Sequence, residues 1–410
     1  MAARIFITQM LRDVRSQKMR TFLTVFGILW GTASVILLLA FGGGIHARQQ
    51  RAFRGMGEYI VIVWPGRTSL PYQGLAKNRP LRLREEDAAL LRDQVRHMGS
   101  ISPEYMKWDA RARVGRIEKM VRVTGCWPEF GPMRNIIPQT GSRFFNPEDM
   151  AHKRRVVFLG TDLKQDLFGE DEAVGRIVIV NGVPLTVIGV MRRKEQDSSY
   201  SGRDTHRAFI PSTTFRSMYG HEYVNNIIFQ ADNPERTPAV KRAVYEVLGA
   251  RHKFDPRDEE ALMMWDTTET EQFFSAFFVG FRVFLGVIGA FTLIVGGISV
   301  SNIMNVVVEE RTREIGIKMA LGAKPRFVMG QFVLETLALT GLGGALGFAF
   351  AALVVTVVPR FNVEEYIGVP EISASVAAAA LSVLGLIGLV SGFFPARRAA
   401  RCNPIEALRL

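Results

Sequence analysis

Residues able to do chemistry are scattered along the 410-residue chain and do not recur at the spacings of an active site. The sequence has no Gly-x-x-x-x-Gly-Lys-[Ser/Thr] phosphate-binding loop, no His-Glu-x-x-His zinc motif, no Cys-x-x-Cys pair and no Gly-x-Ser-x-Gly elbow for a nucleophilic serine. Its six histidines lack metal-ligand spacing, and acidic runs such as Asp258-Glu259-Glu260 are typical of solvated surfaces. We therefore expect no catalytic residue, no cofactor site and no metal site on this chain.

The polar segment with the most informative pattern is Glu309–Ala323, whose sequence is EERTREIGIKMALGA. Acidic and basic side chains stand four residues apart in the order that favours pairing on a helix, at Glu309 with Arg313 and at Glu314 with Lys318. Apolar residues mark one face, and a glycine near the end provides a helix stop. The mixed charges argue against a helix that lies only on lipid, so a helix that docks on a partner protein is favoured.

Four stretches without a charged residue flank this segment and must position it: 21–45, 283–308, 336–359 and 372–396. About 20 apolar residues in a helix cross the hydrocarbon core of a membrane, and a charge at the centre costs roughly 2.5–3.5 kcal/mol. The four stretches therefore predict four transmembrane helices. A cleaved signal peptide is a weaker explanation of the first, because the apolar cores of such signals are shorter, at about 7–15 residues.

The distribution of Lys and Arg predicts the orientation of these helices, because cytoplasmic loops carry an excess of both residues. Basic residues gather in 1–20, 309–326 and 396–410, whereas 360–371 holds one Arg and three Glu. Both termini are therefore predicted in the cytoplasm, and residues 46–282 on the far side of the membrane. The net charge of +9 in these three inner segments is then mainly an orientation signal, and no nucleic-acid partner is expected. The net charge of +6 in residues 46–282 has no explanation in the sequence.

The chain is thus predicted to consist of nine segments. In order, they are a cytoplasmic N-terminal segment 1–20, a first transmembrane helix 21–45, an extracytoplasmic domain with stalk helices 46–282, a second transmembrane helix 283–308, a cytoplasmic coupling segment 309–326, a third transmembrane helix 327–359, a short extracytoplasmic loop 360–371, a fourth transmembrane helix 372–395 and a cytoplasmic tail 396–410.

The outer segment 46–282 is too long for a loop and indicates a folded domain of helices and strands. Asn181-Gly182 is the strongest hairpin signal, between strands expected at Ile177–Val180 and Val183–Val190. The other predicted elements are strands at Tyr59–Trp64 and Asn226–Ala231, helices at Leu83–Met98 and Thr237–Gly249, and helical continuations of the neighbouring spans, as a stalk, at Arg48–Arg54 and Thr268–Arg282.

Glycines four residues apart occur in two uncharged stretches, at Gly27 with Gly31 and at Gly343 with Gly347. This spacing lets helix backbones approach closely, so a helix-packing role is one interpretation, and the general abundance of glycine in membrane helices is the other. Glu335 lies where the third span begins. Pairing with a neighbour or reaching the interface explains this carboxylate better than proton coupling.

Eight short segments, taken in order, resemble a known family: Lys18–Thr24, Gly27–Ile36, Gly141–Phe145, Val156–Gly160, Leu167–Gly169, Val187–Val190, Glu310–Ala323 and Pro395–Arg409. They are similar to MacB-type ABC transporter permeases, and the loop Glu310–Ala323 resembles the one shared with FtsX-like permeases. The resemblance covers nearly the whole chain.

The resemblance implies an α-helical membrane protein with four transmembrane helices and a large extracytoplasmic α+β domain of two lobes on a helical stalk. One lobe would take about 46–130 and 215–265, with the other inserted between them. In the family, ATP-driven motion of an ATPase dimer passes through the spans and stalk to the outer domain. The residues that match the coupling loop are Glu310, Arg311, Thr312, Arg313, Glu314, Ile315, Gly316 and Lys318.

The resemblance also implies partners. Because the sequence starts near the first span, an ABC ATPase that binds ATP and Mg²⁺ is expected on a separate chain, with no enzyme activity on this one. A second permease copy or a close paralogue would complete a dimer, in the cytoplasmic (inner) membrane of a bacterium. A periplasmic adaptor and an outer-membrane channel are further expected partners, besides the lipid bilayer.

The function favoured by the resemblance is efflux of an amphiphile, antibiotic or peptide from the periplasm or outer leaflet. Two alternatives stay open. One is a permease that releases lipoproteins from the membrane, and the other is an FtsX-like regulator that controls an outer hydrolase or sensor without transport.

Overall fold

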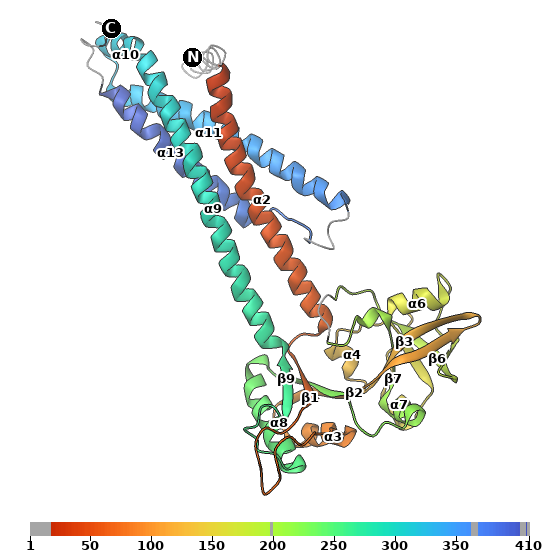
Figure 1. The fold of residues 1–410 in the computed structure, drawn as a ribbon. Helices are drawn as coiled ribbons and strands as arrows, with labels where there is room; N and C mark the ends of the chain where they lie inside the picture. The colour runs from red at the N-terminus through yellow and green to blue at the C-terminus, as the bar shows by residue number, and fades with distance from the viewer. Residues whose placement is uncertain (1–17, 197–199, 362–367, 402–406, 408–410) are drawn as a thin grey trace. The chain divides into compact units, whose positions relative to one another are not determined.

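The computed structural model describes residues 18–196, 200–361, 368–401 and 407. The chain divides into two compact units, which contain the helices and strands labelled in Figure 1. The membrane unit comprises Met1–Arg48 and Ser275–Leu410, and the outer unit comprises Gln49–Phe274. In sequence, the outer unit is therefore an insertion between the two parts of the membrane unit.

Four helices in the described part of the chain are long and apolar enough to cross a membrane, as the sequence predicts. They are α2 (Lys18–Met56), α9 (Thr267–Glu310), α11 (Pro325–Val357, followed by the 3₁₀ turn η3, Val358–Phe361) and α13 (Ala374–Ala400). Each covers almost all of one uncharged stretch, because a helix satisfies its own backbone hydrogen bonds where lipid offers no partner.

The helices α2 and α9 continue beyond their uncharged stretches, through residues 46–56 and 267–282, as the sequence predicts. They contact each other along these extensions. The ring centroids lie 4.9 Å apart for His46 and Phe278, and 5.3 Å apart for Phe53 and Phe274. This contact agrees with a stalk of two paired helices.

The outer unit is built on a nine-stranded sheet in the order β3-β7-β4-β6-β5-β2-β8-β1-β9, in which β3 also pairs with β2. The extra pairing closes β2, β3, β7, β4, β6 and β5 into a ring, while β8, β1 and β9 continue from the first half of β2. The strands are β1 (Ile60–Pro65), β2 (Met98–Val114), β3 (Ile117–Cys126), β4 (Val156–Leu159), β5 (Ile177–Val180), β6 (Val183–Val190), β7 (Arg207–Pro211), β8 (Asn226–Ala231) and β9 (Leu262–Asp266).

The ring and the open part of the sheet are the two lobes, and they share β2. Glu104 on this strand pairs with Asn226 of β8 and with Cys126 of β3. One apolar cluster includes residues of both lobes, such as Val61 and Val187, so the lobes share a core. The expectation that one lobe extends to about residue 130 is wrong for β3, which pairs in parallel with β7 and belongs to the ring.

The hairpin and the helices of the outer unit can be compared with their predictions from the sequence. The Asn181-Gly182 hairpin is confirmed, with φ of 46° and 83° at its two turn residues. The helix α3 (Glu85–Gln94) is shorter than predicted, because β2 begins at Met98. The remaining helices are α4 (Phe130–Met133), α5 (Pro147–Ala151), α6 (Thr161–Phe168), η1 (Asp204–His206), α7 (Ser212–Tyr219), η2 (Pro234–Arg236) and α8 (Thr237–His252).

The predicted stop of α8 at Gly249 is wrong, since the helix continues to His252 and ends at Lys253 with a φ of 55°. Gly249 serves close packing instead. A Cβ at this position would lie 3.0 Å from the carbonyl oxygen of Phe254.

Candidate coupling site

A helix, α10 (Thr312–Ala320), lies where the sequence predicts the coupling segment. Arg311 separates it from α9, with φ −99° and ψ 10°, and Gly322 follows it with a φ of 93°. Glycine adopts such a φ at little cost because it has no Cβ. Pro325 then begins α11, where the missing N–H would have had no helical partner.

One side of α10 is anchored in the membrane unit. Ile315 is 4% exposed and packs in an apolar cluster with residues of α9, α11 and α13. Gly316 is buried against Ala407, and a Cβ on Gly316 would lie 2.6 Å from the Cβ of Ala407. The exposed charged residues of the segment include Glu310, Arg313 and Glu314.

The predicted ion pair of Glu309 with Arg313 does not form between these two described residues. Glu309 Oε1 instead lies 3.7 Å from Arg398 Nη1 of α13. The interruption at Arg311 explains the difference. It places the two predicted partners on different helices, α9 and α10, and so removes the i,i+4 geometry.

The second predicted pair, of Glu314 with Lys318, is also replaced. Lys318 Nζ donates to Gln331 Oε1 of α11 at 3.4 Å. An exposed i,i+4 pair stabilises a helix by only about 0.3–0.5 kcal/mol, so a competing partner on a neighbouring helix is enough to displace it. Glu314 stays exposed.

Arg311 joins the coupling segment to α11 through Glu335. Arg311 Nη1 lies 3.4 Å from Glu335 Oε2, and the two side chains are 17% and 10% exposed. This contact confirms that Glu335 pairs with a neighbour. Because 24 positions separate Arg311 from Glu335, no local pattern in the sequence indicates their contact.

We expect the Glu335→Gln variant to lose about 1–3 kcal/mol of folding free energy, because it removes a charged partner from the mostly buried Arg311. Denaturant titration of the purified full-length chain measures this change. Glu314→Gln is the matched control, since Glu314 is exposed, and its stability should change by less than about 0.5 kcal/mol. Equal stabilities of the two variants would show that the contact with Arg311 does not hold the segment.

The predicted helix-packing glycines differ in their surroundings. A Cβ on Gly343 would lie 2.9 Å from Ile28 Cβ, and one on Gly347 would lie 2.6 Å from the carbonyl oxygen of Leu29. A Cβ on Gly31 would lie 3.3 Å from Leu293 Cδ2 of α9, whereas one on Gly27 would meet no described atom within 4 Å. Gly27 nevertheless lies at the contact with α9, because a Cβ on Gly296 would lie 3.8 Å from the carbonyl oxygen of Gly27. All four glycines therefore lie at helix contacts, although a Cβ added at Gly27 would itself meet no described neighbour.

The outer unit contains a cluster of buried charges that no sequence motif indicates. This ion cluster consists of Glu104, Arg134, Lys194, Asp204 and Arg207, and no group of three or more His, Cys, Asp or Glu in the described ranges could hold a metal ion. The distances are 3.1 Å from Arg134 Nη2 to Asp204 Oδ2, 2.8 Å from Lys194 Nζ to the same oxygen, and 3.3 Å from Arg207 Nη1 to Glu104 Oε1. Because 103 positions separate the last two residues, only the tertiary fold brings the cluster together.

Burial and charge act against each other in the ion cluster. Burial favours a higher pKa for Asp204, but the positive charges of Arg134, Lys194 and Arg207 outweigh it and hold this pKa well below its usual range. Burial lowers the pKa of Lys194 to about 8, despite the attraction of Asp204. Glu104 also lies on the strand that the two lobes share, so the cluster connects them.

These features define a permease-type membrane protein, with four spanning helices, an inserted outer domain and a charged helix between the second and third spans. The family model of the MacB-like periplasmic core domain matches residues 21–247, and that of the FtsX-like permease C-terminal region matches residues 286–404. The chain therefore belongs to the family of MacB-like ABC transporter permeases.

Known relatives are similar along almost the whole chain. The macrolide export ATP-binding/permease protein MacB of Wolinella succinogenes is 31% identical over 403 residues, which cover 97% of this chain and 59% of the relative. The protein of the same name from Azoarcus sp. is 33% identical over 408 residues, which cover 97% of this chain and 58% of the relative. This chain thus spans about three fifths of the length of these relatives.

Among solved structures, the periplasmic region of MacB from Actinobacillus actinomycetemcomitans is similar to this chain, and the matched part covers 54% of this chain and 95% of that structure. The TM-score is 0.43 and the sequence identity is 17%.

Proposed function

We propose that this chain is the permease subunit of a MacB-type ABC transporter and transmits ATP-driven motion from a cytoplasmic ATPase to its outer unit. The helix α10 carries the proposal, because it exposes Arg313 and Glu314 while Ile315 is buried among α9, α11 and α13. A force on its exposed side would reach α11 through the contact of Arg311 with Glu335.

We further propose that ATP and Mg²⁺ bind to a separate ABC ATPase subunit, which is a partner of residues 1–410. Those residues contain no Gly-x-x-x-x-Gly-Lys-[Ser/Thr] phosphate-binding loop. In this proposal the permease itself catalyses no reaction. It acts as a dimer with a second copy or a close paralogue, in a bacterial inner membrane, with both termini in the cytoplasm.

The proposed work is efflux of an amphiphile, antibiotic or peptide, together with a periplasmic adaptor and an outer-membrane channel. The names of the relatives support export, because both are called macrolide export proteins. The test is ATP hydrolysis by the complex in liposomes, with panels of macrolides, amphiphilic peptides and lipoproteins. Stimulation by the first two supports efflux, stimulation by lipoproteins alone favours lipoprotein release, and hydrolysis that responds to no compound favours the regulatory alternative.

We expect the double variant Arg313→Ala, Glu314→Ala to bind the ATPase at least about tenfold more weakly, or to leave its hydrolysis unstimulated. The two residues are exposed, so their loss should leave folding and membrane insertion intact. The measurement is ATPase binding and stimulation with the variant reconstituted in nanodiscs.

Arg360→Ala, Glu371→Ala is the matched control, since it removes the same two charges from exposed positions in the other loop. It should bind and stimulate the ATPase as the wild-type chain does. Normal coupled turnover of the Arg313, Glu314 variant would contradict the role of α10 in transmission.

A further inference from the structure

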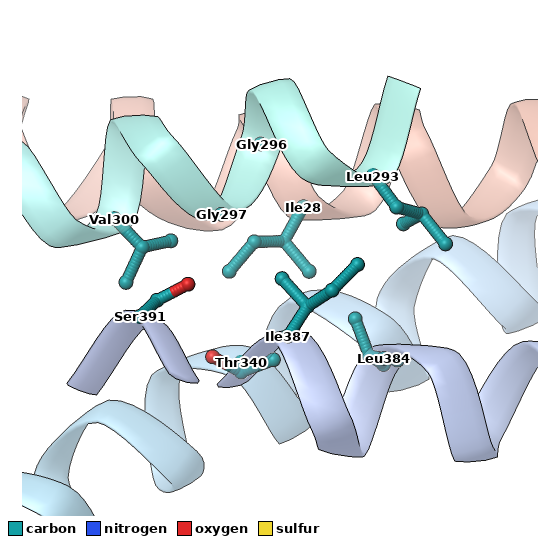
Figure 2. Close-up of a pocket in the computed structure, with 9 residues that line it drawn as sticks. All are labelled: Ile28, Leu293, Gly296, Gly297, Val300, Thr340, Leu384, Ile387 and Ser391. Carbon is teal, nitrogen blue, oxygen red and sulfur yellow. The ribbon is translucent and has the colours of Figure 1, made fainter. Parts of the chain in front are cut away.

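A small cavity lies among α2, α9, α11 and α13 in the membrane unit (Figure 2). Its volume is about 10 Å³, and its wall includes Gly296 and Gly297 of α9 and two hydroxyl groups, those of Thr340 and Ser391. This is the space open to the centre of a water molecule, and a cavity needs roughly 10–15 Å³ of it to hold one water. The space therefore has the size of one water and excludes larger ligands.

The hydroxyl of Thr340 has no hydrogen-bond partner among the described residues, although the residue is only 3% exposed. Other hydroxyls on the membrane helices donate to the carbonyl four residues earlier, as Thr336 does to Phe332 at 2.9 Å and Ser382 to Ala378 at 2.8 Å. Neither Thr340 nor Ser391 makes such a bond within the described ranges. Leaving a buried hydroxyl unpaired costs free energy, and lipid offers no substitute partner.

Gly297 leaves the Ser391 hydroxyl room beside α9. A Cβ on Gly297 would lie 2.9 Å from Ser391 Oγ and 2.5 Å from Ile387 Cγ2. Figure 2 shows the hydroxyl of Ser391, from α13, facing this stretch of α9, and the hydroxyl of Thr340, from α11, farther from α9 on the wall of the same cavity. Two polar groups from different helices thus line a space that an alanine at position 297 would fill.

We propose that this cavity binds one water molecule, which hydrogen-bonds to Thr340 Oγ1 and Ser391 Oγ and bridges α11 to α13. Water can donate and accept at the same time, so it satisfies both hydroxyls, whichever of them donates. The bridge lies against α9, the helix that leads into the coupling segment at Arg311.

A double-mutant cycle on the full-length chain tests this proposal. Thr340→Val and Ser391→Ala each remove one hydroxyl with little change of shape. A cysteine at the fully buried Ala351, in a Cys126→Ser, Cys402→Ser background, reports unfolding of the membrane unit by thiol labelling during an SDS titration. We expect each single variant to lower the folding constant about three- to tenfold, and the double variant to fall short of the product by at least about threefold, because both hydroxyls share one ligand.

The control cycle combines Ser391→Ala with Thr292→Val, whose hydroxyl already donates to Ile288 and does not line the cavity. Its effects should multiply. If the changes in folding constant caused by Thr340→Val and Ser391→Ala multiply in the double variant, the proposal is overturned. A Thr340→Val variant more stable than the wild type would also overturn it, because it would show that no water binds to the Thr340 hydroxyl. A map of the complex that shows other buried waters supports the proposal if density lies within about 2.6–3.2 Å of both oxygens, and overturns it if the cavity is empty.

Discussion

Replacing Asp204 by Asn should cost the outer unit about 3–5 kcal/mol of folding free energy, the usual effect of leaving buried charges unpaired. Arg134 and Lys194 both place a nitrogen within 3.1 Å of this carboxylate, and the Arg134 side chain is fully buried. Asn keeps the shape of the side chain but removes its charge. Water cannot replace the lost partner because the side chains of Arg134 and Asp204 are both 0% exposed.

Cys126 is a built-in reporter for this measurement, since it is buried beside the ion cluster and burial raises the pKa of its thiol well above the usual value. In a Cys402→Ser background it is the remaining cysteine, and its labelling across a urea titration follows unfolding of the outer unit. The control is Asp171→Asn, whose carboxylate is 67% exposed in an ion pair with Arg176, and which should cost less than about 1 kcal/mol. Similar midpoints for the two variants would show that the ion cluster does not stabilise the fold.

The stabilisation of the outer unit by Asp204 should also depend on pH. The pKa of Asp204 is lower in the folded chain than its usual value of 3.8, so the unfolded chain takes up the proton first as the solution is acidified. The stabilisation by Asp204 is therefore complete above about pH 4 to 5 and declines as the pH falls below that range. The difference in stability between the wild-type chain and Asp204→Asn should shrink in acid, whereas a difference independent of pH would exclude the charge as its cause.

Replacing Gly347 by Val should destabilise the membrane unit by about 1–3 kcal/mol, because no flexible side chain can move aside. A Cβ at this position would lie 2.6 Å from the carbonyl oxygen of Leu29 and 2.9 Å from Thr32 Cβ. The helices α11 and α2 would have to separate to accommodate the side chain.

Gly341→Val on the same helix is the matched control, since a Cβ there would meet no described atom within 4 Å. Both variants change helix propensity equally, so the difference between them isolates the close approach of α11 to α2. The SDS midpoint of each full-length variant, read from a labelled cysteine at Ala351, measures it. Equal midpoints would remove the packing role of Gly347.

The membrane helices could be predicted because the free energy of placing a residue in the hydrocarbon core depends mainly on that residue alone. Each charge in a span costs free energy, so uncharged stretches alone indicate where α2, α9, α11 and α13 lie. The hairpin at Asn181-Gly182 was predictable for a similar local reason, since both turn residues need positive φ.

Contacts between distant residues could not be predicted in this way. The ion cluster joins Glu104 to Arg207 across 103 positions, and the coupling segment joins Arg311 to Glu335 across 24, and no local spacing in the sequence relates residues so far apart. The expected lobe boundary near residue 130 failed for the same reason, because β3 pairs with β7, which begins at Arg207, far along the chain. Around α10, the local spacing predicted two ion pairs that do not form. The interruption at Arg311 separates one pair, and Lys318 contacts a residue of the neighbouring α11 in place of its predicted partner.

The central claim, that motion passes from α10 to the outer unit, is tested most directly by distance measurements on the complete complex. A spin label at Met120→Cys, which replaces a side chain that is 79% exposed, reports the separation between the outer units of two copies in a Cys402→Ser background. With a hydrolysis-deficient ATPase, adding ATP should shift the distance distribution of the wild-type permease and leave that of the Arg313→Ala, Glu314→Ala variant unchanged. An unshifted wild type, or an equal shift in the variant, would contradict transmission through α10.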